Sequence, residues 1–580
     1  MITGLALMMS LFAAGVRAET AGDRLRALLA EEWEYAMRDS PVRASQLGDS
    51  RYGALWRDLS EEAFEKRHAH VRELLARLDA FEEAELQPSE RDDLRLFRAE
   101  VRDQEQDLRY GLHLLPVNQR GGLQTLDYLT DVLPFETVRD YEDWIARLRA
   151  FPRLVDQTIH LMRAGVRRGI VHPQVVLERI PEQIDAQIVS TPEGSLFFKP
   201  FTRMPQSWPE SERNRLKAEG ARAIASEVVP AFKEFRSYFI DRYMGAGSSK
   251  IGIWQFPEGR EAYASLVRRH TTTTMTPEAI HKLGLGEVKR IRAEMRRVMK
   301  ETGHRGGLKG FMEFLRTDPR FYYKTSEELL QAYRAIAKRI DPEMVKLFGR
   351  LPRIPYGVVP VPDHVAPHTT TAYYRGPSAD GKRPGLFYVN LYKPQSRPTY
   401  EMEVLTVHEA VPGHHIQIAL AMEHRDVPHF RRFGQVTAFV EGWGLYAESL
   451  GEEIGLYEDP YSKFGELTYR MWRAVRLVVD TGIHHYGWSR EKAIEYFRDN
   501  CAKSEVDIVN EIDRYVIMPG QALSYKIGEL KITELRRRAE RELGEAFDER
   551  AFHDEVLGRG AVTLDMLETG IDEWIKRHKG

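Results

Sequence analysis

Long stretches of amphipathic helical pattern constrain the fold of this 580-residue chain more than any other feature. From Ala21 to about Arg109, and again from Tyr141 to Arg167, apolar residues recur at intervals of three and four. The stretch from Ser211 to Tyr243 has the same pattern and predicts one long helix or two stacked ones. We therefore expect a mostly α fold, in which each helix buries one apolar face.

Prolines cluster between Leu351 and Pro398, where the helical pattern is interrupted. Within this segment Gly385–Tyr392 is rich in aromatic and β-branched residues and is the clearest strand candidate. Thr276 followed by Pro277 predicts the start of a helix. These patterns predict a small antiparallel β-sheet beside otherwise helical structure.

The first 18 residues resemble a secretory signal peptide, because their apolar run of about a dozen residues is too short to cross a bilayer. Val16 and Ala18 offer small side chains for cleavage before Glu19. The alternative is a buried N-terminal helix. We divide the chain into a signal peptide (1–18), an N-terminal helical scaffold (19–270) and a catalytic region (271–580), the last two forming one continuous domain.

The balance of charge argues against some partners. With 84 basic and 87 acidic residues the net charge is −3, so the chain lacks the overall basic character of a nucleic-acid-binding protein. We expect a periplasmic or secreted protein without stable membrane insertion after signal removal. Cys501 is the only cysteine, so a zinc site would need histidine and carboxylate ligands.

The segment Thr406–Gln417, with the sequence TVHEAVPGHHIQ, contains the residues of a metal site. In the usual HExxH motif the two histidines lie four residues apart on one helical face. Here His414 and His415 come six and seven residues after His408. Six residues rotate an ideal helix by about 240°, and seven separate the Cα atoms by about 10.5 Å, so a regular helix suits neither.

Pro412 and Gly413 offer a way to reconcile this spacing, because proline breaks the helical hydrogen bonds and glycine tolerates unusual dihedral angles. A bulge at this point would bring the second histidine towards His408. We favour His414 as the ligand, with His415 as the alternative ligand or a nearby hydrogen-bonding residue.

Glu441 and Glu448 lie seven residues apart on one face of a predicted helix. We predict Glu441 as the third ligand, and Glu448 as the acceptor of a hydrogen bond from a liganding imidazole. Two histidines, a glutamate and a water make an open, catalytic zinc site, expected to hold one Zn²⁺ per chain. Glu409 is then expected to act as the general base for the water.

Polar and aromatic residues between later helical stretches offer further candidates. Tyr525 and His484 could donate to the oxyanion of a tetrahedral intermediate. Lys526 or Arg383 could hold a substrate carboxylate. The strand Gly385–Tyr392 could pair with an extended peptide.

Longer motifs resemble the bacterial domain-of-unknown-function family 885. They are His408–His415 (HEAVPGHH), Glu441–Glu448 (EGWGLYAE), Asp480–His484 (DTGIH), Pro519–Tyr525 (PGQALSY), Gly252–Gly259 (GIWQFPEG) and Arg383–Asn390 (RPGLFYVN). The resemblance covers most of the chain after residue 18, and it adds Asp480 to the residues around the metal and Asn390 to those that contact substrate.

The pair Glu441 and Glu448 also looks like the third-ligand helix of the thimet-oligopeptidase and angiotensin-converting-enzyme type of zinc metallopeptidases. This resemblance implies a two-lobed helical body with a deep central cleft and a preference for short peptides.

The predicted function is hydrolysis of oligopeptides by an exported zinc peptidase, of the carboxypeptidase or dipeptidyl carboxypeptidase type. One alternative is a zinc amidase acting on cell-wall peptides or another small amide. The other is a zinc-containing binding protein without turnover, against which the presence of Glu409 argues.

Overall fold

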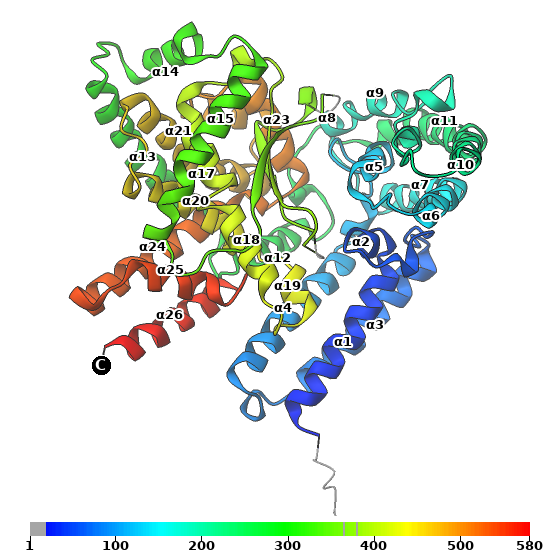
Figure 1. Cartoon of the computed structure of the whole chain (residues 1–580), viewed down its shortest axis with the longest axis horizontal. Helices are drawn as coiled ribbons and strands as arrows, with labels where there is room; N and C mark the ends of the chain where they lie inside the picture. The colour runs from blue at the N-terminus through cyan, green and yellow to red at the C-terminus, as the bar shows by residue number, and fades with distance from the viewer. Residues whose placement is uncertain (1–18, 364–365, 379–380, 580) are drawn as a thin grey trace, which may run out of the picture.

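The computed structural model describes residues 19–363, 366–378 and 381–579, so the predicted signal peptide lies outside the described residues. Helices dominate this part of the chain, as the apolar periodicity predicts (Figure 1). In the N-terminal half they are α1 (Ala21–Asp39), α2 (Pro41–Gln46), α3 (Glu61–Asp79), α4 (Pro88–Arg109), α5 (Leu129–Val132), α6 (Val138–Arg149), α7 (Phe151–Arg168), α8 (Gln174–Leu177), α9 (Ile180–Asp185), α10 (Glu210–Ala223), α11 (Val229–Tyr238) and α12 (Gly259–Thr271).

The second half continues with α13 (Pro277–Glu301), α14 (Leu308–Thr317), α15 (Ser326–Ile340), α16 (Met344–Leu347), α17 (Met402–Glu409), α18 (His414–Glu423), α19 (His429–Phe433), α20 (Thr437–Glu453), α21 (Pro460–His484), α22 (Arg490–Arg498), α23 (Glu505–Ile517), α24 (Ser524–Leu543), α25 (Glu549–Gly558) and α26 (Leu564–His578). Helix α13 packs along α21, and α20 packs along α24. These two contacts form the framework around the predicted metal site.

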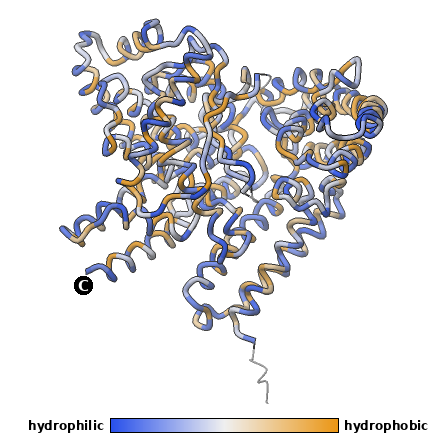
Figure 2. The backbone as a smooth tube through the Cα atoms, in the orientation of Figure 1, coloured by the Kyte–Doolittle hydropathy of each residue, from blue (hydrophilic) through white to orange (hydrophobic). Residues whose placement is uncertain are grey.

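Individual helices follow the sequence pattern closely. Figure 2 shows hydrophobic and hydrophilic residues alternating along α1 and α3, whose apolar faces meet α4. The predicted helix over 211–243 forms one continuous helical run, in which π-helical turns follow α10 and α11. Helix α13 begins where it was predicted, because the Thr276 hydroxyl accepts a hydrogen bond from the backbone N–H of Ala279.

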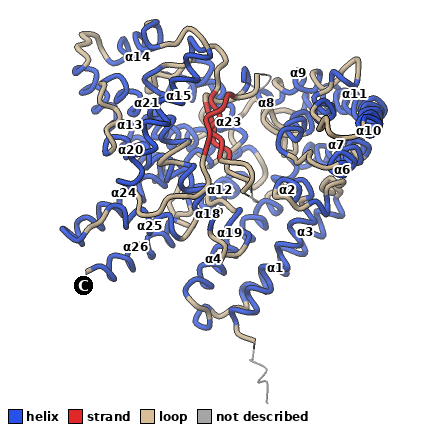
Figure 3. The backbone as a smooth tube through the Cα atoms, viewed as in Figure 1, coloured by secondary structure: helices blue, strands red, loops and turns tan. Residues whose placement is uncertain are grey.

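Three short strands form the sheet: β1 (Tyr356–Pro360), β2 (Ala372–Arg375) and β3 (Gly385–Val389) (Figure 3). Their order is β1-β3-β2, with β1 parallel and β2 antiparallel to β3. The predicted strand is confirmed as β3, but the expectation of a purely antiparallel sheet is wrong. After β1 the chain forms β2 at the opposite edge of the sheet and then returns as β3 between them. Strand β3 therefore pairs with both β1 and β2.

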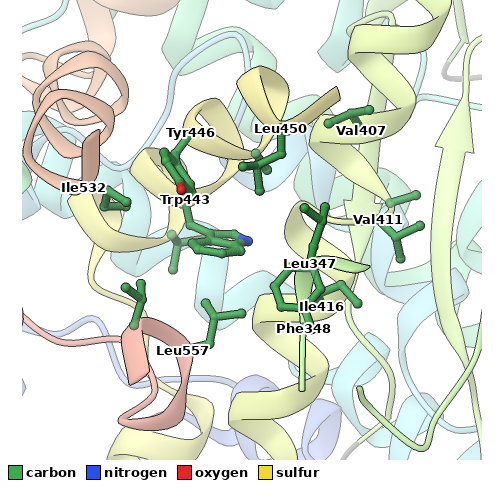
Figure 4. Close-up of a cluster of buried hydrophobic side chains, with 14 of the residues drawn as sticks. Leu347, Phe348, Val407, Val411, Ile416, Trp443, Tyr446, Leu450, Ile532 and Leu557 are labelled. Carbon is green, nitrogen blue, oxygen red and sulfur yellow. The ribbon is translucent and has the colours of Figure 1, made fainter. Parts of the chain in front are cut away.

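A hydrophobic core lies next to the segment that carries the histidines. Figure 4 shows Trp443 of α20 among apolar side chains that include Val407 and Val411 before His414, and Ile416 after it. All four side chains are buried. In the described part of the chain, no helix combines the length and the apolar character that crossing a bilayer requires.

Candidate metal centre

The turn between α17 and α18 folds the histidine motif back on itself. Helix α17 ends at Glu409 and α18 begins at His414, so the four intervening residues replace a helical turn. The Val411–Pro412 peptide bond is cis. At position 413 a Cβ atom would lie 2.0 Å from the carbonyl oxygen of His408, so only glycine fits this close approach. The interruption that Pro412 and Gly413 predict is therefore present.

This turn is fixed from the neighbouring helix. The indole Nε1–H of Trp443 donates a 3.0 Å hydrogen bond to the backbone carbonyl of Pro412. Trp443 lies between Glu441 and Gly444 on α20, the helix that faces the turn. The contact therefore fixes α20, which carries Glu441, relative to the turn between His408 and His414.

Three side chains from α17, α18 and α20 converge as the sequence predicts. Ligand atoms of His408, His414 and Glu441 all lie within 4.8 Å of one another. The Oε2 atom of Glu441 is 3.8 Å from Nε2 of His408 and 3.6 Å from Nε2 of His414. Tetrahedral zinc with bonds of about 2.0 Å needs ligand atoms about 3.3 Å apart. The two distances from Glu441 would shorten by a few tenths of an ångström on metal binding, and the histidine–histidine distance, at most 4.8 Å here, by up to about 1.5 Å.

The protonation states of two of these ligands also fit a cation. Burial, together with the charges of His414 and Arg473, holds the pKa of His408 well below its usual value, so this imidazole is neutral. Burial alone would raise the pKa of Glu441, but the hydrogen bond and charge of His414 and a hydrogen bond from Tyr525 lower it to about 2. Neutral imidazole and ionised carboxylate are the forms that bind metals.

His414 differs from His408 because its contact with Glu441 favours the positively charged imidazolium. Burial opposes its positive charge, but hydrogen bonding to Glu441 and the charges of Glu441 and Glu409 raise the pKa of His414. A divalent cation would add its own positive charge beside Glu441 and would favour the neutral form of His414, as metal binding to histidine does in general.

Glu448 fixes the orientation of His408. The Nδ1–H of His408 donates a 2.8 Å hydrogen bond to Oε1 of Glu448, which leaves Nε2 with its lone pair directed at Glu441. The same carboxylate oxygen lies 3.3 Å from Nη2 of Arg473. Glu448 is fully buried, and this burial raises its pKa to about 7 despite the charge of Arg473.

Glu409 lies beside the three ligands. Burial raises its pKa to about 7, although the charge of His414 opposes this shift. The charge of Glu441 and the backbone of Tyr374, on strand β2, also act on its carboxyl group. Glu409 therefore lies between the ligand cluster and the edge of the sheet.

His415 points away from the cluster. Its Nδ1 forms a 2.9 Å hydrogen bond with the Tyr374 hydroxyl, and its ring lies 4.9 Å from that of Tyr356. The geometry therefore separates the two alternatives that the spacing left open. His414 lies with the ligands, and His415 links α18 to the sheet.

Tyr525 reaches the cluster from α24. Its hydroxyl hydrogen-bonds to Glu441, and the guanidinium of Arg476 lies 4.2 Å from the centre of its ring. Burial and the negative charge of Glu441 raise the pKa of Tyr525, so the hydroxyl keeps its proton.

His484 and Asp480 do not join the cluster. The Nδ1 of His484 accepts from the backbone N–H of Ile253, and its Nε2–H donates to the carbonyl of Tyr515. Both ring nitrogens are thus occupied, which corrects the expectation of an oxyanion donor. The Asp480 carboxylate accepts from the Tyr263 hydroxyl and from the backbone N–H of Gly520, so it fixes the loop before α24.

Two predicted substrate-binding residues have structural contacts instead. Lys526 is fully buried, and its ammonium group lies 3.2 Å from Glu287 and 2.8 Å from Glu529. Asn390 is also buried and donates to the backbone carbonyls of residues 366 and 370. Both polar groups are thus engaged in contacts within the protein. A lysine can be buried in a helix when, as here, two glutamates compensate its positive charge.

Arg383 lies beside the sheet, where its guanidinium donates to the carbonyls of Gly376 and Pro384. The expectation that β3 pairs with a peptide is wrong, because β1 and β2 occupy both of its edges. Strands β1 and β2 are the two edge strands, and β2 lies beside Glu409 and His415.

A cavity of about 1890 Å³ lies apart from the three ligands. Its lining includes Asp103 and Asp107 of α4, Arg269 of α12 and Thr437 at the start of α20, but none of His408, His414 and Glu441. None of the three candidate ligands lines this cavity, so the deep cleft that the resemblance implies is not confirmed. The side chain of Glu441 keeps 19% of its surface exposed, which gives solvent access to the cluster.

Comparisons with known proteins identify relatives but no activity. The family described as bacterial protein of unknown function (DUF885) matches residues 41–571. No curated protein matches the chain. A solved structure from Colwellia psychrerythraea, described as a putative lipoprotein, has a TM-score of 0.91 and 27% identity, and the match covers 97% of this chain and all of that one.

A second solved structure, described as a putative lipoprotein of unknown function from Shewanella oneidensis, has a TM-score of 0.72 and 18% identity. The match covers 95% of this chain and 99% of that one. This likeness supports the fold alone. None of the comparisons supports the resemblance to thimet-oligopeptidase relatives.

Proposed function

We propose that this chain, which belongs to the bacterial DUF885 family, hydrolyses peptide bonds of oligopeptides at a zinc site formed by His408, His414 and Glu441. The observation that carries the proposal is the convergence of these three side chains beside the buried carboxyl group of Glu409. A structural zinc site would use four protein ligands, whereas three ligands with solvent access are typical of a catalytic one.

When bound at such a site, zinc polarises a carbonyl group and lowers the pKa of water towards 7. Glu409 is placed to accept a proton from the attacking water and to deliver it to the leaving amine. The Tyr525 hydroxyl keeps its proton and hydrogen-bonds to Glu441, so it can donate to the developing oxyanion once a bound zinc takes Glu441 as a ligand. Each of these two residues thus has one role in the hydrolysis.

Strand β2 supports a peptide as the substrate. Its outer edge pairs with no other strand among the described residues, and the backbone of Tyr374 on this strand lies beside Glu409. An extended peptide could hydrogen-bond along this edge with its scissile bond next to the base. A small amide without a peptide backbone would form fewer hydrogen bonds along this edge.

We also propose export of the protein. The two similar solved structures are described as lipoproteins, and the sequence of residues 1–18 has the pattern of a signal peptide. The only cysteine of this chain, Cys501, is buried. A periplasmic location would give the enzyme access to short peptides released outside the cytoplasm.

The test uses the purified chain without residues 1–18, loaded with zinc and incubated with a mixed oligopeptide library that is read by mass spectrometry. We expect trimming from the C-terminus by the wild type and no trimming by Glu409→Gln, which keeps its zinc because Glu409 is not a ligand. Zinc binding without cleavage of any peptide would exclude the peptidase. Cleavage by Glu409→Gln at the wild-type rate would exclude the role of Glu409.

A further inference from the structure

An excess of positive charge lies next to the candidate metal centre. Glu511 of α23 forms ion pairs with Arg476, at 3.1 Å, and with Arg514, at 3.0 Å. One buried carboxylate therefore compensates two buried guanidinium groups. The Nη1 atom of Arg476 is buried without a hydrogen-bond partner among the described residues.

A third arginine joins this group from a distant part of the sequence. The charged and polar groups that act on the Arg120 guanidinium are Arg514, Glu511, Tyr525 and Arg476. Arg120 keeps solvent access and forms no ion pair with the described residues. Desolvation by the surrounding protein, and then repulsion from Arg514, lower its pKa, while the charge of Glu511 opposes this shift.

The turn that carries Arg120 is held firmly against α23. Backbone hydrogen bonds join Asn118 and Gly121 in both directions across the turn. The side-chain amide of Gln119 donates a 3.0 Å hydrogen bond to the backbone carbonyl of Asp513, and the backbone carbonyl of Gln119 accepts one from the side chain of Gln183. Three attachments fix a four-residue turn, and the one side chain in it without a partner of its own is that of Arg120.

Tyr525 connects the arginines to the ligands. Its hydroxyl hydrogen-bonds to Glu441, while Arg476 lies 4.2 Å from the centre of its ring. Arg476, the member of the positive group nearest to the candidate ligands on these contacts, is thus separated from Glu441 by about the width of one tyrosine ring. One extended residue spans about 3.3–3.6 Å, so a carboxylate one or two residues beyond the scissile bond would reach this group.

We propose that Arg120 binds the free C-terminal carboxylate of the peptide, in the positive field of Arg476 and Arg514. This assignment rests on the proposed peptidase function and makes the enzyme a carboxypeptidase that releases one or two residues. Arginine suits the role because its guanidinium binds a carboxylate through two parallel hydrogen bonds. The incoming carboxylate adds a second negative charge to a group in which the single carboxylate of Glu511 faces three arginines.

The experiment assays the zinc-loaded protein on two forms of one pentapeptide. One form has a free C-terminal carboxylate, and the other is amidated at its C-terminus. We expect the wild type to prefer the free acid by at least tenfold in kcat/KM, the effect of one charge-assisted hydrogen-bonded pair. Arg120→Gln should lose this preference mainly through a higher KM, and Arg120→Lys should keep part of it. Arg305→Gln, which changes an exposed arginine between α13 and α14, is the matched control.

Equal cleavage of the two peptides by the wild type, or an unchanged preference in Arg120→Gln, would overturn the inference while leaving the peptidase intact. An amidated peptide ending in glutamate distinguishes the C-terminal carboxylate from an acidic side chain. If this peptide matches the free acid, the C-terminal assignment is wrong.

Binding to the zinc-loaded Glu409→Gln variant, measured by calorimetry, tests the subsite without turnover. Tighter binding of the free acid than of the amide, lost when Arg120→Gln is added, supports the subsite even if no peptide is cleaved. Absence of cleavage by the wild type would then refute the peptidase function alone. Equal binding of acid and amide would refute the subsite.

Discussion

At the scale of single residues, the site depends on side chains that set the state of their neighbours. Glu448 is a clear case, because its carboxylate accepts from His408 at 2.8 Å and so determines which imidazole nitrogen is free. Hydrogen-bonding partners of this kind raise ligand basicity and fix ring orientation. The metal affinity of the site should therefore respond to a residue that does not touch the ion.

Glu448→Gln should weaken zinc binding by about tenfold to a hundredfold, since its amide is a poorer acceptor for the His408 N–H. Competition with a fluorescent chelator measures the affinity. Glu452→Gln, an exposed change on the same helix, should leave it unchanged. Wild-type affinity in Glu448→Gln would show that the hydrogen bond to His408 does not support a metal.

Gly444 offers a second test at this scale. A Cβ at this position would lie 2.8 Å from Cε1 of His408 and 3.1 Å from Cε1 of His414, so Gly444→Ala should push both rings from their positions. We expect at least a tenfold loss of zinc affinity, read by the same competition, with helix content retained in circular dichroism. Gly286→Ala on α13, where a Cβ meets no atom within 4 Å, is the control. Unchanged affinity in Gly444→Ala would place the metal elsewhere.

At the scale of helices, the close approach of α20 and α24 brings Tyr525 to Glu441. A Cβ on Gly442 would lie 2.5 Å from the Cα of Gly528, and a Cβ on Gly528 would lie 2.0 Å from the carbonyl oxygen of Ala438. The two glycines therefore permit a helix spacing that larger residues would prevent. Gly528 lies one turn after Tyr525, and Gly442 follows Glu441, so the contact and the site share the same turns.

Gly528→Ala should force these helices apart and destabilise the fold by about 1–3 kcal/mol, the usual cost of overpacking. Urea unfolding measures the stability, and the activity should fall further than stability alone explains because Tyr525 moves away from Glu441. Gly310→Ala on α14, where a Cβ meets no atom within 4 Å, should have neither effect. Full stability and activity in Gly528→Ala would contradict the close contact.

Sequence patterns predicted the elements whose signals are local. The helices follow from apolar periodicity, the break before His414 from Pro412 and Gly413, and strand β3 from its aromatic composition. Strand β1 was not predicted, because Tyr356–Pro360 is short, ends in proline and is defined by its pairing with residues about 30 positions away. The parallel pairing of the sheet was missed for the same reason.

At the scale of the whole molecule, the residues that sequence analysis placed wrongly depend on contacts across the chain. Lys526 resembled a substrate-binding cation, but its partner Glu287 comes from α13, more than 200 residues earlier. No sequence motif contains Arg120. It was missed because Arg476 and Arg514, the arginines that act on it in the fold, lie more than 350 residues later in the sequence. Residue spacing identifies candidate metal ligands that lie on one turn or one helix. The partners of a charged side chain become visible only when helices that are distant in the sequence are placed together in the fold.

Removal and return of the metal in one sample tests the central claim most directly. The purified chain is assayed on a free-acid oligopeptide before chelation, after chelation and after one equivalent of zinc is restored, with cleavage read by mass spectrometry. We predict C-terminal cleavage that is lost on chelation and recovered at one zinc per chain. Cleavage that persists in the metal-free chain, or that is absent at full zinc occupancy, would contradict a zinc peptidase.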